Sequence, residues 1–197
     1  ECMEEKQITV DGETKPLGAP FFVIATQNPV ESSGTFALPE AQLDRFLVRL
    51  TLGYPSTKES VDILTNYISG SPLVQLDAVA TGEEITAIQS AISGVLVSDP
   101  IKEYIVALVE ATRKNDDVEL GVSTRGMLSM LRACQAYAAI HGRDYVLPDD
   151  VKALAVPVFA HRLILKVKYN SANKASEIIY RLLGTIPAPT ESTTQKL

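Results

Sequence analysis

The sequence predicts the end of an α/β sheet followed by an α-helical domain, so that the chain is mostly helical overall. Residues Phe21–Thr26 form a continuous apolar run, which is typical of a strand buried on both faces of a parallel sheet. From Ser56 onward, helix-start signals recur, and each is followed by apolar residues at helical spacing. These two patterns together predict part of an α/β core joined to about five or six helices.

Composition and charge exclude several classes of protein. The chain has 197 residues, of which 46% are hydrophobic and 21% charged, as in ordinary globular domains. Its 18 basic and 24 acidic residues give a net charge of −6, so we expect no nucleic-acid partner. No apolar run approaches the ~18 residues that a membrane span needs, so we expect no membrane span.

Cysteine and histidine usage indicates a reducing compartment and no metal site. The cysteines are Cys2 and Cys134, too few and too far apart for a disulfide framework or a CxxC pair. His141 and His161 have no cysteine or carboxylate at ligand spacing. No basic segment opens the chain, so we expect a cytoplasmic protein. The chain begins at Glu1 rather than at Met, which we expect of a piece cut from a longer protein.

Residues 1–57 are expected to supply strands and turns. Asp11-Gly12 lies between two short strand-like segments and predicts a hairpin, because both positions tolerate positive φ. Phe21–Thr26 predicts one buried strand, and Leu47–Leu52 predicts a second. Between them, Pro39 is expected to open a short helix that ends near Phe46.

Residues 58–186 are expected to form the helical domain. Capping boxes, N-cap residues and first-turn prolines mark the helix starts. The expected starts are at Ser56, Thr81, Asp99, Ser123 and Pro148, with a last helix over 172–183 that ends at Gly184. Residues 187–197 are rich in Pro and Thr, and we expect them to be a disordered tail.

Asn28 is the first candidate for chemistry. It follows the predicted strand Phe21–Thr26, and ligands of open α/β sheets bind outside the carboxyl ends of the strands. A side-chain amide there can donate to a phosphate oxygen or orient a water molecule, as phosphoryl transfer requires. The alternative is that Asn28-Pro29 simply makes a turn.

Arg45 is the second candidate. It lies between apolar residues at the end of the predicted short helix, where its side chain would be stiffly held. Such a guanidinium suits a catalytic contact made across a subunit boundary. The alternative is an arginine that binds the last carbonyls of its own helix and complements the helix dipole.

Arg125 is the third candidate. The sequence Ser123-Thr124-Arg125-Gly126 places a cation in the first turn of a helix, where the helix dipole disfavours it. The helix amides, the cap hydroxyl and the guanidinium together can bind an anion, and Gly126 would let a ligand approach the backbone. The alternative is a solvent-exposed arginine with no ligand.

Several long motifs resemble one family. The run PFFVIATQNPVESSGTFALPEAQLDRFLVRLTLGYPS (residues 20–56) closely resembles the MoxR family of AAA+ ATPases. The segments at residues 121–126 (GVSTRG), 141–155 (HGRDYVLPDDVKALA) and 159–165 (FAHRLIL) are similar to that family as well. The resemblance extends over residues 1–188 and implies the carboxyl-terminal part of a P-loop AAA+ module: the end of the α/β core and the helical lid.

The resemblance implies roles for the three candidates. Asn28 matches the sensor 1 residue, Arg45 the arginine finger that acts in trans, and Arg125 the sensor 2 arginine that contacts nucleotide phosphates. The predicted hairpin at residues 7–20 resembles the pre-sensor 1 insertion of this clade. Thr124 stands before the sensor 2 arginine where the family usually has proline, so the presentation of Arg125 can differ.

The same resemblance implies ATP and Mg²⁺ as cofactors and a hexameric ring. It also implies chaperone-like remodelling or maturation of protein complexes, with von Willebrand A domain partners or metal insertion. The Walker A pattern GxxxxGK[ST] has no match, and the sequence contains no Asp-Glu pair for Walker B. We therefore expect the Walker motifs upstream of these residues and no activity from the 197 residues alone.

Two other functions remain open from the sequence. One is a non-enzymatic helical module that binds a partner protein through residues 58–184. The other is an AAA+ motor that acts in transcription or DNA processing, against which the acidic charge of the chain counts.

Overall fold

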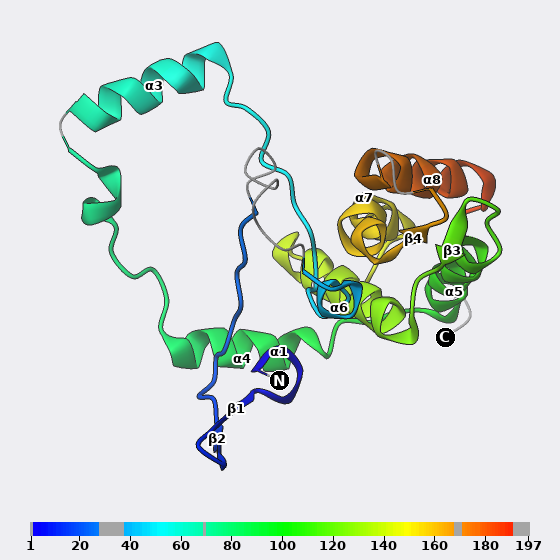
Figure 1. Cartoon of the computed structure of the whole chain (residues 1–197), viewed down its shortest axis with the longest axis horizontal. Coiled ribbons are helices and arrows are strands. Elements are labelled where there is room, and N and C mark those ends of the chain that lie inside the picture. The colour runs from blue at the N-terminus through cyan, green and yellow to red at the C-terminus, as the bar shows by residue number, and fades with distance from the viewer. Residues whose placement is uncertain (1, 28–37, 69, 168–170, 191–197) are drawn as a thin grey trace.

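The computed structural model describes residues 2–27, 38–68, 70–167 and 171–190 (Figure 1). Its centre is a packed body of four helices with two short strands, formed by the second half of the chain. The helices of this packed body are α5 (Asp99–Arg113), α6 (Thr124–Ile140), α7 (Pro148–Phe159) and α8 (Ser171–Thr185). These four helices, all within residues 99–185, therefore pack against one another as one unit.

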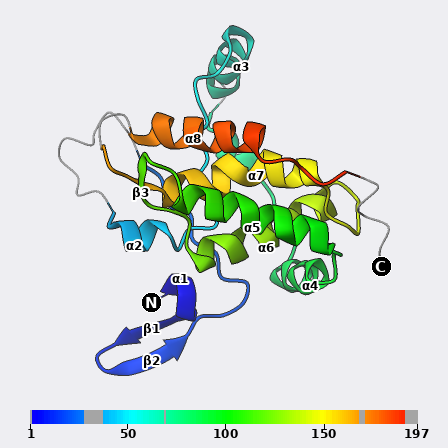
Figure 2. The ribbon, with the colours of Figure 1, turned by 90° about the vertical axis from the view of Figure 1, so that its right-hand side faces the viewer.

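Apolar faces of α5, α6, α7 and α8 form the core of the packed body. Figure 2 shows α5, α7 and α8 lying side by side, and α6 and α7 make the most extensive contact. Among the described residues, the largest fully buried side chains are those of Leu108, Val109, Thr112, Val122, Met130, Cys134, Val151, Val158, Phe159, Ile178 and Ile179. Most of these side chains come from apolar helix positions three and four residues apart, whereas Thr112 is polar and Val122 lies just before α6.

Two small elements close one side of the packed body. Strand β3 (Val118–Leu120) pairs antiparallel with β4 (Ile164–Leu165), which directly follows the 3₁₀ helix η2 (Ala160–Arg162). Val118 and Leu165 of this pair are buried against α8 residues Ala175 and Ile178. The pair therefore attaches the chain between α7 and α8 to the chain between α5 and α6.

The predicted hairpin is confirmed. Strands β1 (Gln7–Val10) and β2 (Glu13–Pro16) pair antiparallel after the short helix α1 (Cys2–Glu5). The turn residues Asp11 and Gly12 have φ values of 52° and 81°, as a two-residue turn of this kind requires.

The predicted helix starts before the packed body are confirmed as well. Helix α3 (Thr57–Ile68) begins with reciprocal bonds between Ser56 and Glu59, and α4 (Gly82–Ile92) begins with the same box at Thr81 and Glu84. The 3₁₀ helix η1 (Pro72–Gln75) lies between them. In Figure 1, α3 stands well away from the packed body, and its apolar side chains are exposed.

The two predicted strands are not formed. Residues 21–26 and 47–52 carry no strand assignment, and Phe22 and Ile24 are each 77% exposed. A parallel strand exists only when a neighbour accepts and donates its backbone hydrogen bonds, and the described part of the chain offers these segments no such neighbour. The prediction was wrong for the described residues because pairing, unlike helix formation, is not local.

Some helix boundaries also differ from the predictions. Helix α2 (Glu40–Leu43) ends before Phe46. Ser98 occupies the N-cap of α5, so that Asp99 lies in the first turn. Gly184 lies inside α8 rather than ending it, and Ala188 beyond the helix packs against the core.

Thr112 provides a test of the packed body. Its buried hydroxyl donates to the Val109 carbonyl (2.6 Å) and accepts from the Val122 amide (3.0 Å). We expect Thr112→Val to lower the free energy of unfolding by about 1–3 kcal/mol, because it leaves the Val122 amide buried without a partner. Urea unfolding of the chain measures this change.

The matched control is Thr65→Val. Thr65 makes a similar bond within its own helix, to the Val61 carbonyl, but is exposed. We expect this change to stay within about 0.5 kcal/mol. Equal losses for the two variants would contradict the importance of the buried Thr112–Val122 bond.

Candidate functional site

The carboxylate of Asp44 is the centre of the candidate site. Asp44 follows α2 in a turn, and three donors from the packed body surround it. Ser123 Oγ donates to its two oxygens (3.1 and 3.2 Å), Arg162 Nε donates to Oδ1 (3.1 Å), and Arg125 donates to Oδ2 (3.3 Å). One carboxylate thus joins the segment after α2 to the start of α6 and to η2.

Arg162 is the most buried of these donors, with a side chain only 1% exposed, compared with 20% for Asp44. Its guanidinium also donates to the backbone carbonyls of Asp44 (3.2 Å), Phe46 (2.6 Å) and Leu47 (3.3 Å). Burial lowers the pKa of Arg162 from its usual value, while the Asp44 carboxylate acts in the opposite direction. The arginine therefore binds the turn after α2 through both the side chain and the main chain.

The other contacts of Arg162 fix it to the packed body. It donates to the Val158 carbonyl at the end of α7 and to Ser129 Oγ on α6 (3.2 Å). A Cβ atom on Gly126 would lie 2.7 Å from Arg162 Cδ and 2.6 Å from Val122 Cγ1. Only glycine at position 126 lets α6 approach Arg162 this closely.

Arg125 lies in the first turn of α6, as predicted. Ser123 caps this helix by accepting from the Gly126 amide (3.1 Å), which confirms the expected N-cap. The Arg125 side chain is 42% exposed while it contacts Asp44. The carboxylate offsets the unfavourable helix dipole at this position, and the exposed guanidinium remains accessible to an anion.

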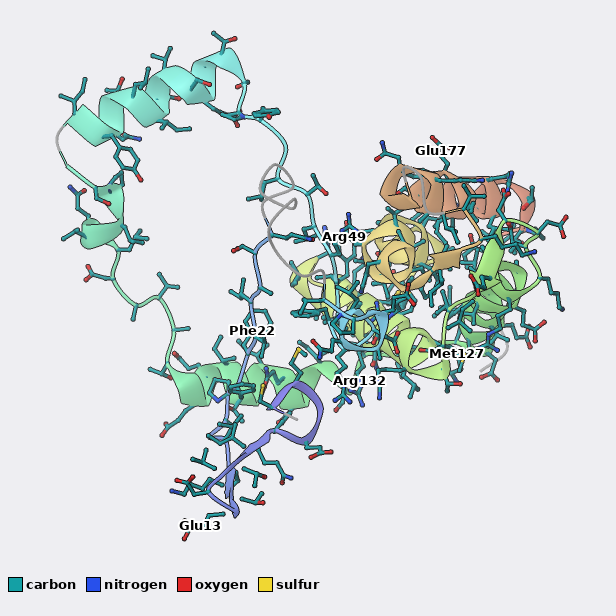
Figure 3. All side chains as sticks on the ribbon, viewed as in Figure 1. Glu13, Phe22, Arg49, Met127, Arg132 and Glu177 are labelled. Carbon is teal, nitrogen blue, oxygen red and sulfur yellow. The ribbon has the colours of Figure 1, made fainter. Side chains whose placement is uncertain are left out.

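Arg45 directly follows Asp44 in the chain and is half-buried. Its amide donates to the Gln42 carbonyl at the end of α2 (3.1 Å). Further along, the Arg49 amide donates to the Pro157 carbonyl (2.9 Å), and Figure 3 places Arg49 beside α7. Residues 40–49, here called the Arg45 segment, are therefore held to the packed body on both sides of Arg45.

Of the three predicted site residues, Arg125 belongs to the Asp44 cluster and Arg45 lies next to this cluster in the chain. Arg125 contacts Asp44, and Arg45 is the next residue along the chain from it. Asn28 lies outside the described residues. Sequence reasoning missed Asp44 and Arg162 as partners, although each lies in a motif that carries the family resemblance. No local spacing relates two residues so far apart in the chain.

His161 lies beside the same cluster. Its Nε2 atom is 2.9 Å from the Arg162 guanidinium and 3.2 Å from the Phe46 carbonyl oxygen. Burial, together with the charge of Arg162, lowers the pKa of His161 to about 4. The imidazole is therefore neutral at pH 7, which avoids a second buried cation next to Arg162.

The charge and the helix start at Arg125 suit an anionic ligand. Within residues 2–27, 38–68, 70–167 and 171–190, no three His, Cys, Asp or Glu side chains gather closely enough to hold a metal. Arg125 at the start of the seventeen-residue helix α6 has the charge and the position that a phosphate group requires.

Among the described helices, none combines the length and the apolar character that crossing a bilayer requires.

Two known protein families match separate parts of the chain. Residues 1–48 match the family described as ATPase family associated with various cellular activities (AAA), and residues 110–181 match the AAA lid domain. The first match contains Arg45, and the second contains Arg125 and Arg162. The fold and these two matches identify the chain as part of a protein of the AAA+ ATPase class, comprising the end of the core and the helical lid.

Similar proteins indicate the family within the AAA+ class. The chain is 45% identical to the uncharacterized protein YeaC of Bacillus subtilis, over 97% of this chain and 60% of that protein. It is 35% identical to Chaperone MoxR1 of Mycobacterium tuberculosis, over 96% of this chain and 52% of that protein. A crystal structure from Cytophaga hutchinsonii, assigned as an ATPase, superposes with a TM-score of 0.84 at 34% identity and covers 96% of this chain and 60% of its own. The chain belongs to the MoxR family, and it spans only about half to three-fifths of the length of these relatives.

The low pKa of His161 predicts a pH dependence of stability. The pKa is about 4 in the folded chain and near 6.5 when unfolded, so between these values the unfolded state binds the additional proton. We expect the free energy of unfolding to fall by up to about 3 kcal/mol as the pH drops through this range. His161→Gln removes this contribution, which urea unfolding between pH 7 and pH 4 measures.

His141 is the matched control, because it is exposed. We expect His141→Gln to keep the pH slope of the original chain. Parallel slopes for the original chain and the His161→Gln variant would contradict the assignment.

Proposed function

We propose that the chain is part of an ATPase that couples ATP binding and hydrolysis to chaperone-like remodelling or maturation of protein complexes. The observation that carries the proposal is the Asp44 cluster. It joins the turn that presents Arg45 to the helix start that presents Arg125. The name of one relative, Chaperone MoxR1, supports the chaperone-like role.

Arg125 contacts nucleotide phosphates from the lid, and its position at the start of α6 supports this role. Arg45 acts in the active site of a neighbouring subunit as an arginine finger. Asn28 senses the terminal phosphate and orients the attacking water. Phosphoryl transfer depends on such positioned charges and dipoles, because the protein contributes little covalent chemistry.

The rest of the catalytic machinery comes from other parts of the protein. We expect the Walker A and Walker B motifs, which bind ATP and Mg²⁺, upstream of these residues, and the greater length of the relatives supports this expectation. An arginine finger that acts in trans requires a ring of subunits, and by resemblance this ring is a hexamer. Von Willebrand A domain proteins are the partners we expect by the same resemblance.

Arg45→Ala tests the trans-acting role in the intact ATPase. We expect the rate of ATP hydrolysis to fall by about 10³-fold or more, because the charge that stabilises the transition state is lost. Nucleotide affinity should remain within about twofold, since the bound nucleotide of each subunit keeps its own contacts. Steady-state hydrolysis and equilibrium binding of a fluorescent ATP analogue measure the two effects.

Arg49→Ala is the matched control, because it removes an exposed arginine four positions further along the same segment. We expect it to keep near-normal hydrolysis. A normal rate for Arg45→Ala, or an equal loss in both variants, would overturn the assignment of Arg45.

The 197-residue chain on its own tests where the catalytic parts lie. We expect no magnesium-dependent ATP hydrolysis from a pure preparation, because neither Walker motif occurs in the sequence. Phosphate release above the level of a buffer blank, copurifying with the chain through two columns, would contradict this expectation.

A further inference from the structure

Arg162 holds the segment that carries Arg45. Four of its hydrogen bonds end on this segment: one on the Asp44 carboxylate and three on the carbonyl oxygens of Asp44, Phe46 and Leu47. These acceptors lie on both sides of Arg45 in the chain. Their common donor therefore restricts the backbone from which the Arg45 side chain extends.

The remaining contacts of Arg162 attach it to the lid. Val158 and Ser129 accept from the same guanidinium, and Gly126 leaves room for its stem against α6. The side chain is almost fully buried and fills a fixed site between α6, α7 and the turn after α2. Arg162 thus contacts α6, the end of α7 and the Arg45 segment at the same time, and Ser123 and Arg125 add contacts from the start of α6 to Asp44.

We infer that Arg162 is a positioning residue: it fixes the Arg45 segment on lid helix α6 so that the arginine finger and the sensor 2 arginine move as one unit. This inference rests on the proposed function for the roles of Arg45 and Arg125. The physical attachment that it describes does not depend on those roles.

A lysine at position 162 cannot make the same set of hydrogen bonds as Arg162. A guanidinium presents five N–H donors in a rigid plane, while an ammonium offers three donors on a flexible stem. The acceptors around Arg162 lie on three different parts of the chain: the turn after α2, helix α6 and the end of α7. Lysine keeps the charge opposite Asp44 but leaves several of these carbonyls without a donor.

Asp44 continues to attach the Arg45 segment to the lid when Arg125 binds a ligand. Arg125 is the most exposed of its three donors, whereas Arg162 is the most buried. A phosphate can therefore draw Arg125 away while Ser123 and Arg162 continue to hold the carboxylate. The Arg45 segment then stays on the lid throughout the nucleotide cycle.

Hydrogen exchange of the 197-residue chain tests the attachment directly. We expect Arg162→Lys to accelerate exchange of the amides in residues 40–49 by about tenfold or more, because the segment loses its anchoring hydrogen bonds. Amides in the middle of α5 should exchange as in the original chain. Unchanged exchange over residues 40–49 in the folded variant would overturn the inference.

The matched control is Arg143→Lys. Arg143 makes a short two-pronged contact with buried Asp150 (2.6 and 2.7 Å), so this variant weakens another arginine–aspartate pair of the lid. Those bonds hold the start of α7 rather than the Arg45 segment. Acceleration over residues 40–49 as large as that in Arg162→Lys would also overturn the inference.

A second variant covers the case in which Arg162→Lys does not fold. Asp44→Asn leaves the buried arginine and its carbonyl bonds in place but removes the charge that it faces. We expect faster exchange over residues 40–49, to a smaller extent. Exchange as slow as in the original chain would overturn the inference.

The intact ATPase provides the functional readout. We expect Arg162→Lys to lower kcat by about tenfold or more while KM for ATP stays within about twofold, because the affected contact acts in the transition state. Arg143→Lys should keep both values. A normal kcat with accelerated exchange would overturn the positioning role, whereas a normal rate in Arg45→Ala would overturn the proposed function and leave the exchange result standing.

Discussion

The contact between Asp44 and Arg162 is the constraint on which the rest of the site depends. It joins residues that are far apart in the chain, and its arginine is almost fully buried. Removing one partner of a buried ion pair costs about 3–5 kcal/mol, because the other charge stays without compensation. The backbone carbonyls, Ser129 and the close approach of Gly126 all depend on the same guanidinium, so the start of α6 and the turn after α2 keep one arrangement.

Packing is distributed unevenly along the described part of the chain. The packed body has a continuous apolar core, whereas α3 and the β1–β2 hairpin expose most of their side chains (Figure 3). Local capping boxes and a favourable turn stabilise α3 and the hairpin, and α4 has a capping box together with contacts to α6. The turn after α2 differs from them, since its place depends on contacts between its residues and distant residues such as Arg162 and Ser123.

The sequence predicted the site residues that have a local signal, and it missed the residues that act through distant partners. Arg125 was predicted from its unfavourable place at a helix start, and the structure adds the carboxylate that makes the place tolerable. Arg45 was predicted from its apolar neighbours and the family motif, and its role stays a prediction. Asp44 and Arg162 were missed because an ion pair between distant residues leaves no spacing signal in the sequence.

Helix caps and tight turns depend on residues close together in the chain, and the sequence predicted these local features correctly. The capping boxes at Ser56 and Thr81, the cap at Ser123 and the hairpin turn at Asp11 all formed, because each needs partners only a few residues away. Strands at residues 21–26 and 47–52 did not form, since their hydrogen bonds require neighbours from elsewhere. The position of Arg162 beneath the Arg45 segment likewise arises only when α6, α7 and the turn after α2 pack together, because a buried charge is stable only where all its partners meet.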